Sequence, residues 1–134
     1  MTATETTTHI TQLGTVGIPV RDQDKALDFY VGVLGFEKGM DVAFGQGERW
    51  VEVAPSGAST SIALMRAGDG QPAGVDTRLR LTTSDAHADH AGLLARGVDV
   101  EPGVMPYPVP MFSFRDPDGN RLIIVERPTT AERQ

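Results

Sequence analysis

This 134-residue chain has few side chains that bind metal strongly, because it contains no cysteine and only three histidines. Without thiolates, the strong metal ligands available are His, Asp and Glu. His87 and His90 are three residues apart in a segment of helical character, a spacing that lets two imidazoles share one face. We expect them instead to be ordinary helix residues, with His90 on the apolar side and His87 near the helix start. Glu52 and Glu126 lie on predicted strands, but two carboxylates without a histidine predict only a weak metal site.

Two arginines form a second group with possible chemistry. Arg78 and Arg80 flank Leu79 in a segment that alternates polar residues with leucine, as a strand does. Side by side on one strand face, two guanidiniums can clamp a carboxylate, a phosphate or another oxyanion. The competing interpretation is that they form salt bridges across the sheet, to Glu52, Glu126 or nearby aspartates. A general acid or base leaves no spacing signature, so the sequence assigns no catalytic residue.

Flat, adaptable side chains for a planar ligand are also present. Trp50 is the strongest of them, because it alternates with Val51 and Val53, which account for the opposite face of its strand. The Pro-rich stretch 106–110 is predicted to be a stiff loop rather than a strand. Aromatic residues in strands usually belong to the core, so each candidate has a structural explanation as well. The set comprises Trp50, Met65, Tyr107, Met111, Phe112 and Phe114.

Composition narrows the class of protein. Twelve Lys and Arg against eighteen Asp and Glu give a net charge of −6, and no stretch is basic, so nucleic acid binding is disfavoured. No apolar run approaches the ~18 residues of a membrane-spanning helix. The N-terminus lacks the basic and apolar regions of a secretion signal, which predicts a cytoplasmic protein. The acidic balance mildly favours cationic ligands, although net charge also simply maintains solubility.

The first half of the chain predicts one strand, one helix and three more strands. A strand is expected over 14–20, and Asp22 is expected to cap a helix that ends at Gly35. The helix carries an apolar stripe at i, i+3, i+4, i+7 and i+8. Three short strands follow around 38–44, 48–54 and 61–66, separated by Gly- and Pro-containing turns.

The second half repeats this order. A strand is expected over 78–83, a helix from the Asp85 cap to Gly97, and strands over 98–104, 111–114 and 121–126. The last two strands are joined by Asp116-Pro117-Asp118-Gly119-Asn120, whose proline, glycine and Asx residues favour a tight turn. The repeated spacing from Asp cap to Gly stop predicts a duplicated β-α-β-β-β module.

The length predicts one domain. We expect it over 12–127, with a first module at about 12–67 and a second at about 77–127. The polar ends at 1–11 and 128–134 are predicted to be disordered tails.

Two motifs carry a resemblance to a known family. They are Ile-Pro-Val-Arg-Asp-x-x-x-Ala-x-x-Phe-Tyr-x-x-x-Leu-Gly-Phe, from Ile18 to Phe36, and Phe-x-Asp-Pro-Asp-Gly-Asn-Arg-Leu near the end. With the repeat, they resemble the vicinal oxygen chelate superfamily, which includes glyoxalase I, extradiol dioxygenases and bleomycin resistance proteins. The resemblance implies an α+β fold in which two tandem βαβββ modules form a cup-shaped, eight-stranded mixed sheet with helices outside. It also implies a homodimer.

Enzymes of this superfamily hold a divalent metal in the cup on His and Glu side chains. The matching positions in this chain are Thr15, Ala63, Arg78 and Ile123. These side chains cannot form the usual shell of imidazole and carboxylate ligands, and an arginine there would repel a cation. The resemblance therefore predicts that the metal site is lost and that no cofactor binds.

Those four positions also predict which residues line the cup. Period-two alternation adds Gly17, Met65, Arg80, Thr82, Arg121 and Val125, and sends Leu79, Leu81, Leu122 and Ile124 toward the helices. Ligand contacts are predicted for Thr15, Trp50, Met65, Arg78, Arg80, Tyr107, Phe112 and Ile123.

The resulting hypothesis is a metal-independent protein that binds a small organic molecule, as in drug or secondary-metabolite sequestration. The arginines suit an anionic ligand, whereas the acidic chain suits a cationic one. One alternative is a metal-dependent lyase, isomerase or dioxygenase. Another is a metal-free enzyme using Arg, Tyr107 or Glu52. The last alternative is a binding module that has no small ligand.

Overall fold

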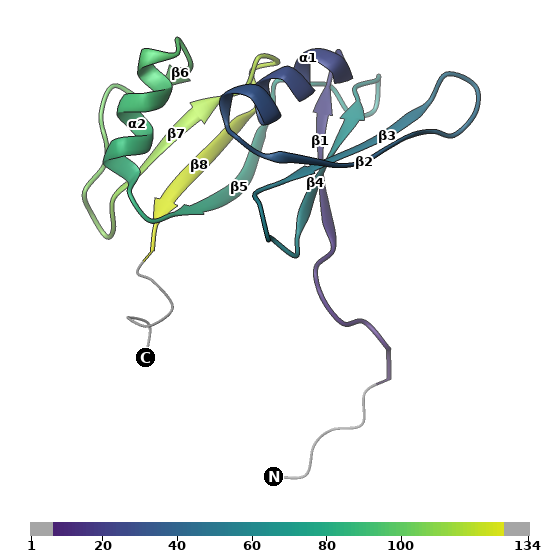
Figure 1. The fold of residues 1–134 in the computed structure, drawn as a ribbon, viewed down its shortest axis with the longest axis horizontal. Helices are drawn as coiled ribbons and strands as arrows, with labels where there is room; N and C mark the ends of the chain where they lie inside the picture. The colour runs from purple at the N-terminus through teal and green to yellow at the C-terminus, as the bar shows by residue number, and fades with distance from the viewer. Residues whose placement is uncertain (1–6, 128–134) are drawn as a thin grey trace.

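The computed structural model describes residues 7–127. The predicted tail at 128–134 and residues 1–6 of the predicted N-terminal tail lie outside the described residues. Residues 7–14 are exposed and form neither helix nor strand, and Figure 1 shows them leading away from the sheets. No helix within 7–127 is long and apolar enough to cross a membrane.

The first module forms one four-stranded sheet with its helix. Its strands lie in the order β1-β4-β3-β2, with β1 parallel to β4 and the other pairs antiparallel. In chain order the elements are β1 (Thr15–Val20), α1 (Gln23–Leu27), η1 (Asp28–Val33), β2 (Glu37–Ala43), β3 (Arg49–Ala54) and β4 (Ser61–Arg66).

The second module repeats this topology, which confirms the predicted βαβββ duplication. Its order is β5-β8-β7-β6, with β5 parallel to β8. Gly17 pairs with Ala63 in the first module as Arg80 pairs with Ile123 in the second. The eight strands thus form two four-stranded mixed sheets, one per module (Figure 1). The elements are β5 (Asp76–Thr83), α2 (Ala86–Ala95), β6 (Asp99–Val100), β7 (Met111–Arg115) and β8 (Arg121–Glu126).

Both helices begin at the predicted capping residues. The carboxylate of Asp22 accepts a hydrogen bond from the Lys25 amide at 3.1 Å, and that of Asp85 accepts one from the Ala88 amide at 3.0 Å. The first helix differs from the prediction, because after Leu27 it widens into the π-helix η1. Phe29 and Tyr30 both lie in the interior, as the predicted apolar stripe of this helix requires.

One hydrophobic core spans both modules on the helix side of the sheets. Phe29 of η1 lies 6.1 Å from Phe114 of β7, ring centre to ring centre, so the first helix packs against the second module. The sheets contribute alternate residues to this core, as period two predicts. These include Ile18, Val20, Val51, Val53, Ile62, Leu64, Phe112, Phe114, Leu122 and Ile124, with Leu79 and Leu81 packed against them.

Candidate functional site

Each sheet has a second face, opposite the helices, which we call the open face. It carries the residues that alternate with the core residues, and most of them are exposed or half-buried. Seven of the eight predicted ligand residues are outside the core, and six of these lie on sheet strands that contribute to the open faces. The six are Thr15, Trp50, Met65, Arg78, Arg80 and Ile123.

The open face of the first module carries a row of hydrogen-bonded side chains. The indole nitrogen of Trp50 donates to Glu52 Oε2 at 2.6 Å, and the Ser61 hydroxyl donates to Glu52 Oε1 at 2.9 Å. Ser61 Oγ in turn lies 2.9 Å from Thr15 Oγ1. The sequence reasoning identified Trp50 and Thr15 but not their link through Ser61 and Glu52. Strand register creates that link. Thr15 of β1 pairs with Ser61 of β4, and Glu52 of β3 pairs with Ala63, which lies two residues further along β4 on the same face.

A hollow lies next to this row. Its volume is about 530 Å³, and β1, β4 and the connection to β5 line it with Gly17, Pro19, Met65, Gly70, Gln71, Pro72 and Val75. The Met65 thioether packs over Gly17, where a Cβ would come within 2.8 Å of the sulfur. The glycine therefore makes room for a flexible apolar side chain in the lining of the hollow.

The open face of the second module carries the two arginines. Arg78 has φ of +62°, in the left-handed region, and its amide donates to Asp76 Oδ1 at 3.0 Å. The pairing of β5 with β8 shifts register between Asp76 and Arg80, so Arg78 lies in an irregular part of the strand. Both arginines are exposed while the intervening Leu79 packs on the core, as the alternation predicts.

The competing interpretation of these arginines, salt bridges across the sheet, does not hold among the described residues. Neither Arg78 nor Arg80 forms an ion pair within 7–127, and Arg80 donates only to the Arg78 carbonyl, at 3.4 Å. The carboxylate of Glu52 is engaged by Trp50, and that of Glu126 accepts from the Ala86 amide at 3.0 Å. Among residues 7–127, no carboxylate therefore competes with a ligand for these guanidiniums.

One aromatic prediction, that of Phe112 as a ligand contact, is wrong. Phe112 is 0% exposed and packs edge-to-face on His90 at 5.1 Å, so it lies on the helix side and not on the open face. The reason is register: Ser113 pairs with Ile123, which puts Ser113 on the open face and both neighbouring phenylalanines in the core. Tyr107 is 81% exposed, on a loop outside both sheets.

A different cavity lies on the helix side, between the modules. It measures about 360 Å³ and is lined by twelve residues, including Val33, Phe36, Leu81, Leu93 and Arg96. None of the predicted ligand residues lines it. The Arg96 guanidinium donates to the Val33 carbonyl at 2.8 Å, a hydrogen bond that joins the modules.

The turn at 116–120 is held by several buried hydrogen bonds. Asp116 Oδ1 accepts from the amides of Asp118 and Asn120, both at 2.9 Å, and Oδ2 accepts from the Tyr30 hydroxyl at 2.8 Å. Burial, together with the Asp116 carboxylate, raises the pKa of Tyr30 far above its usual range. The phenol is therefore held protonated as a hydrogen-bond donor.

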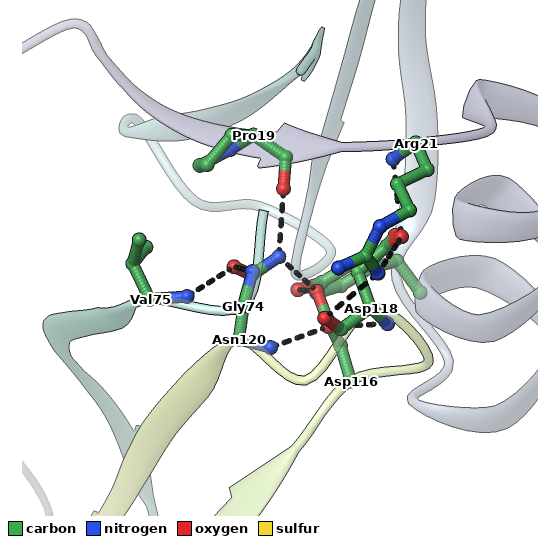
Figure 2. Close-up of polar contacts among 8 residues, drawn as sticks. Pro19, Arg21, Gly74, Val75, Asp116, Asp118 and Asn120 are labelled. Carbon is green, nitrogen blue, oxygen red and sulfur yellow. Dashed lines mark hydrogen bonds and ion pairs between the residues drawn. The ribbon is translucent and has the colours of Figure 1, made fainter. Parts of the chain in front are cut away.

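The same turn joins the two modules, as Figure 2 shows. Asn120 donates to the Pro19 carbonyl at 2.7 Å and accepts from the amides of Gly74 and Val75 at 2.8 and 3.0 Å. Arg21 pairs with Asp118 at 3.1 Å. The motif is thus a structural clamp, with its polar groups facing protein partners rather than an open surface.

The residues at the superfamily's metal positions do not suit a divalent cation. Thr15 is part of the hydrogen-bonded row, Ala63 and Ile123 offer no donor atom, and Arg78 is a cation. Within 7–127, no three His, Asp or Glu side chains gather as a metal-binding group. His90 Nε2 lies 2.6 Å from the Glu101 carbonyl, which is the structural role expected for it.

Comparisons with known proteins agree on a family. The chain matches the family model described as Glyoxalase/Bleomycin resistance protein/Dioxygenase superfamily over residues 9–124. The uncharacterized protein YetH of Bacillus subtilis (strain 168) is 31% identical over 124 residues, which cover 87% of this chain and 99% of that protein.

Two solved structures are similar in sequence and in fold. A member of the same superfamily from Sphaerobacter thermophilus is 39% identical, with a TM-score of 0.82 over 88% of this chain and 98% of that one. TnmS3, an antibiotic binding protein from Streptomyces sp. CB03234, is 38% identical, with a TM-score of 0.78 over 90% of this chain and 99% of that one. The chain therefore belongs to the Glyoxalase/Bleomycin resistance protein/Dioxygenase superfamily.

Proposed function

We propose that this protein binds a small organic molecule on its open faces without a metal ion and acts by sequestering it. The observation that carries the proposal is the pair of arginines on β5, neither of which forms an ion pair within 7–127; one of them is at a position where the superfamily's enzymes hold metal. A guanidinium there favours an oxyanion and disfavours a divalent cation.

The ligand class follows from what the two open faces offer. Trp50, Met65 and the hollow beside Gly17 provide flat or adaptable apolar surface, which suits a planar, largely apolar molecule. Arg78 and Arg80 provide bidentate donors for an oxygen-rich or anionic edge. Thr15 and Ile123 are expected to contact the same ligand. Tyr107 remains a predicted contact from the loop.

The similarity to TnmS3, described as an antibiotic binding protein, supports sequestration rather than catalysis. Binding for sequestration requires shape, apolar area and a few polar anchors, and no activated nucleophile or general base. The alternative function, that of a metal-dependent lyase, isomerase or dioxygenase, is distinguished by the binding test described below.

We also propose a homodimer. Large apolar side chains remain exposed on the β2–β3 hairpin, where Met40, Val42 and Phe44 occupy alternate positions, and on the segment before β1, where Ile10 is 79% exposed. A second copy that covered them would remove apolar area from water. Light scattering coupled to size exclusion should give twice the monomer mass of 14.4 kDa.

The function is tested by binding in the absence of metal. Trp50 is the only tryptophan, so its fluorescence reports directly on the open face. Planar aromatic acids such as 2-naphthoate should quench it saturably with a chelator present, and Arg80→Ala should weaken binding about tenfold.

The matched control is Arg66→Ala. Arg66 follows Met65, is exposed and pairs with Glu48 at 3.2 Å. Its loss should leave the affinity unchanged. Stoichiometric metal in protein purified without added metal, with binding that disappears on chelation, would contradict the proposal and favour a metalloenzyme.

A further inference from the structure

The row of side chains on the first module has a defined hydrogen-bond direction. It crosses three strands, from Thr15 of β1 through Ser61 of β4 to Glu52 and Trp50 of β3. We call these four residues the relay. Glu52 and Ser61 also line a small hollow of about 150 Å³ at the edge of the same face.

The direction follows from counting protons. A carboxylate only accepts hydrogen bonds, so the single hydroxyl proton of Ser61 is used by Glu52 at 2.9 Å. The contact of 2.9 Å between Ser61 and Thr15 then requires Thr15 to be the donor. Thr15 Oγ1 has no proton left, and it presents only lone pairs to the open side of the sheet.

The other end of the relay fixes the tryptophan. Its one polar hydrogen is donated to Glu52 at 2.6 Å, a short and charge-assisted hydrogen bond. The indole therefore offers a ligand its apolar ring surface and no donor. Anchoring the ring also reduces the entropy lost when a ligand stacks on it.

We infer that the relay makes the first module selective for planar ligands that carry a hydroxyl or N–H donor, which Thr15 accepts beside the fixed face of Trp50. This inference rests on the proposed function and refines it. The second module supplies cationic donors through its arginines, so the two modules recognise opposite hydrogen-bonding groups of one ligand.

Replacing Glu52 by glutamine should reverse the relay. The amide oxygen can still accept from the indole, but the amide nitrogen now donates to Ser61 Oγ. The Ser61 proton is then free to donate to Thr15, whose own proton turns toward the ligand. The open end changes from an acceptor to a donor with almost no change in side-chain volume.

A matched pair of probes reads out this polarity. By calorimetry, 2-naphthol should bind the wild-type protein about fivefold more tightly than 2-methoxynaphthalene, which cannot donate, as one net hydrogen bond predicts. Glu52→Gln should bring the ratio close to one, and Thr15→Val should do the same by removing the hydroxyl. Glu48→Gln, which removes an exposed carboxylate paired with Arg66, should leave the ratio at its wild-type value.

A second measurement needs no ligand. The single tryptophan gives one indole N–H resonance in a ¹⁵N-labelled sample, and loss of the carboxylate should shift it upfield. Glu52→Gln should move this resonance strongly and Ser61→Ala more weakly, whereas Glu48→Gln should not move it.

The outcomes separate the two proposals. Equal binding of both probes by the wild-type protein, or a ratio that Glu52→Gln leaves unchanged, overturns the relay inference alone. An indole resonance that is insensitive to Glu52→Gln does the same. Failure of the wild-type protein to bind either probe overturns the proposed planar-ligand function itself.

Discussion

The turn at 116–120 and the open face of β5 are both rich in charged and polar residues, but they use them in opposite ways. In the turn, Asp116 and Asn120 are buried, and their side-chain oxygens and nitrogen are bonded within the protein. On β5, Arg78 and Arg80 are exposed and have no carboxylate partner within the described chain. The first pattern is that of a structural element, and the second is that of a binding surface.

This difference shows how a family motif and a family function can separate. The Asp-Pro-Asp-Gly-Asn turn holds the two modules together through Pro19, Arg21, Gly74 and Val75, so any member that keeps the fold has a reason to keep the turn. The side chains of Thr15 and Arg78, at two of the open-face positions, make no hydrogen bond between the modules within 7–127. The open-face positions are free to exchange metal ligands for threonine, alanine, arginine and isoleucine.

The largest expected effect comes from removing Asn120, which is 0% exposed. Asn120→Ala should lower the free energy of unfolding by about 3 kcal/mol, because it leaves the Gly74 and Val75 amides and the Pro19 carbonyl without their partner. Urea unfolding measures this. Arg80→Ala should change stability by less than about 0.5 kcal/mol. Similar losses in the two variants would refute the contrast between turn and open face.

The hydroxyl of Tyr30 should matter less. Tyr30→Phe is expected to cost about 1 to 1.5 kcal/mol, because Asp116 Oδ2 keeps its bond to Asn120 when the phenol is lost.

The pH dependence of the same variant gives an independent check. The folded-state pKa of Tyr30 is raised above the unfolded value of about 10, so the phenol's contribution is fully present below pH 10 and is lost as pH rises further. Denaturation monitored from pH 8 to 11 should therefore show a steeper loss in the wild type than in Tyr30→Phe. Equal slopes would mean that Tyr30 ionises freely in the folded protein.

Arg78→Gly should separate stability from binding. Glycine adopts φ of +62° without strain, so the variant should be more stable by about 0.5 kcal/mol, while ligand affinity falls. Arg80→Gly is the matched control, because Arg80 has no positive φ and glycine within a strand should destabilise by up to about 1 kcal/mol. A destabilised Arg78→Gly would show that the guanidinium has a structural role.

The smallest effect concerns a charge cluster outside both regions. Hydrogen bonds from Arg49, and then from Lys38, hold the pKa of Asp41 well below its usual range. A carboxyl group whose pKa is lowered by folding stabilises the folded state at pH values above its unfolded pKa of about 3.9. This stabilisation is lost as the pH falls below that value. Between pH 5 and pH 2, Asp41→Asn should lose less thermal stability than the wild type. An equal loss would show that the cluster is screened by solvent.

Local signals predicted most of the fold. Asp22 and Asp85 begin their helices, and Gly35 and Gly97 follow them with φ of +82° and +80°, because capping and left-handed turns depend on one or two residues. The π-helical turn at Phe29 was not predicted. The apolar spacing of this segment is compatible with either helix type, so it could not show where the α-helix widens.

The site was predicted less completely, because it depends on register between strands. Phe112 was assigned to the ligand, yet β7 places it against His90 in the core. The link from Thr15 through Ser61 to Glu52 was missed, since it joins residues of three strands. Arg78 and Arg80 were assigned to the face away from the core from the family's ligand positions and period-two alternation, and the structure has both exposed while Leu79 and Leu81 pack on the core.

Amide chemical-shift mapping during titration with 2-naphthol tests the central claim most directly. The account predicts the largest shifts on the open faces, at Gly17, Ala63 and Ile123, with little change at the 116–120 turn. Shifts centred on Leu93 and Arg96 would place the ligand in the helix-side cavity and contradict the account.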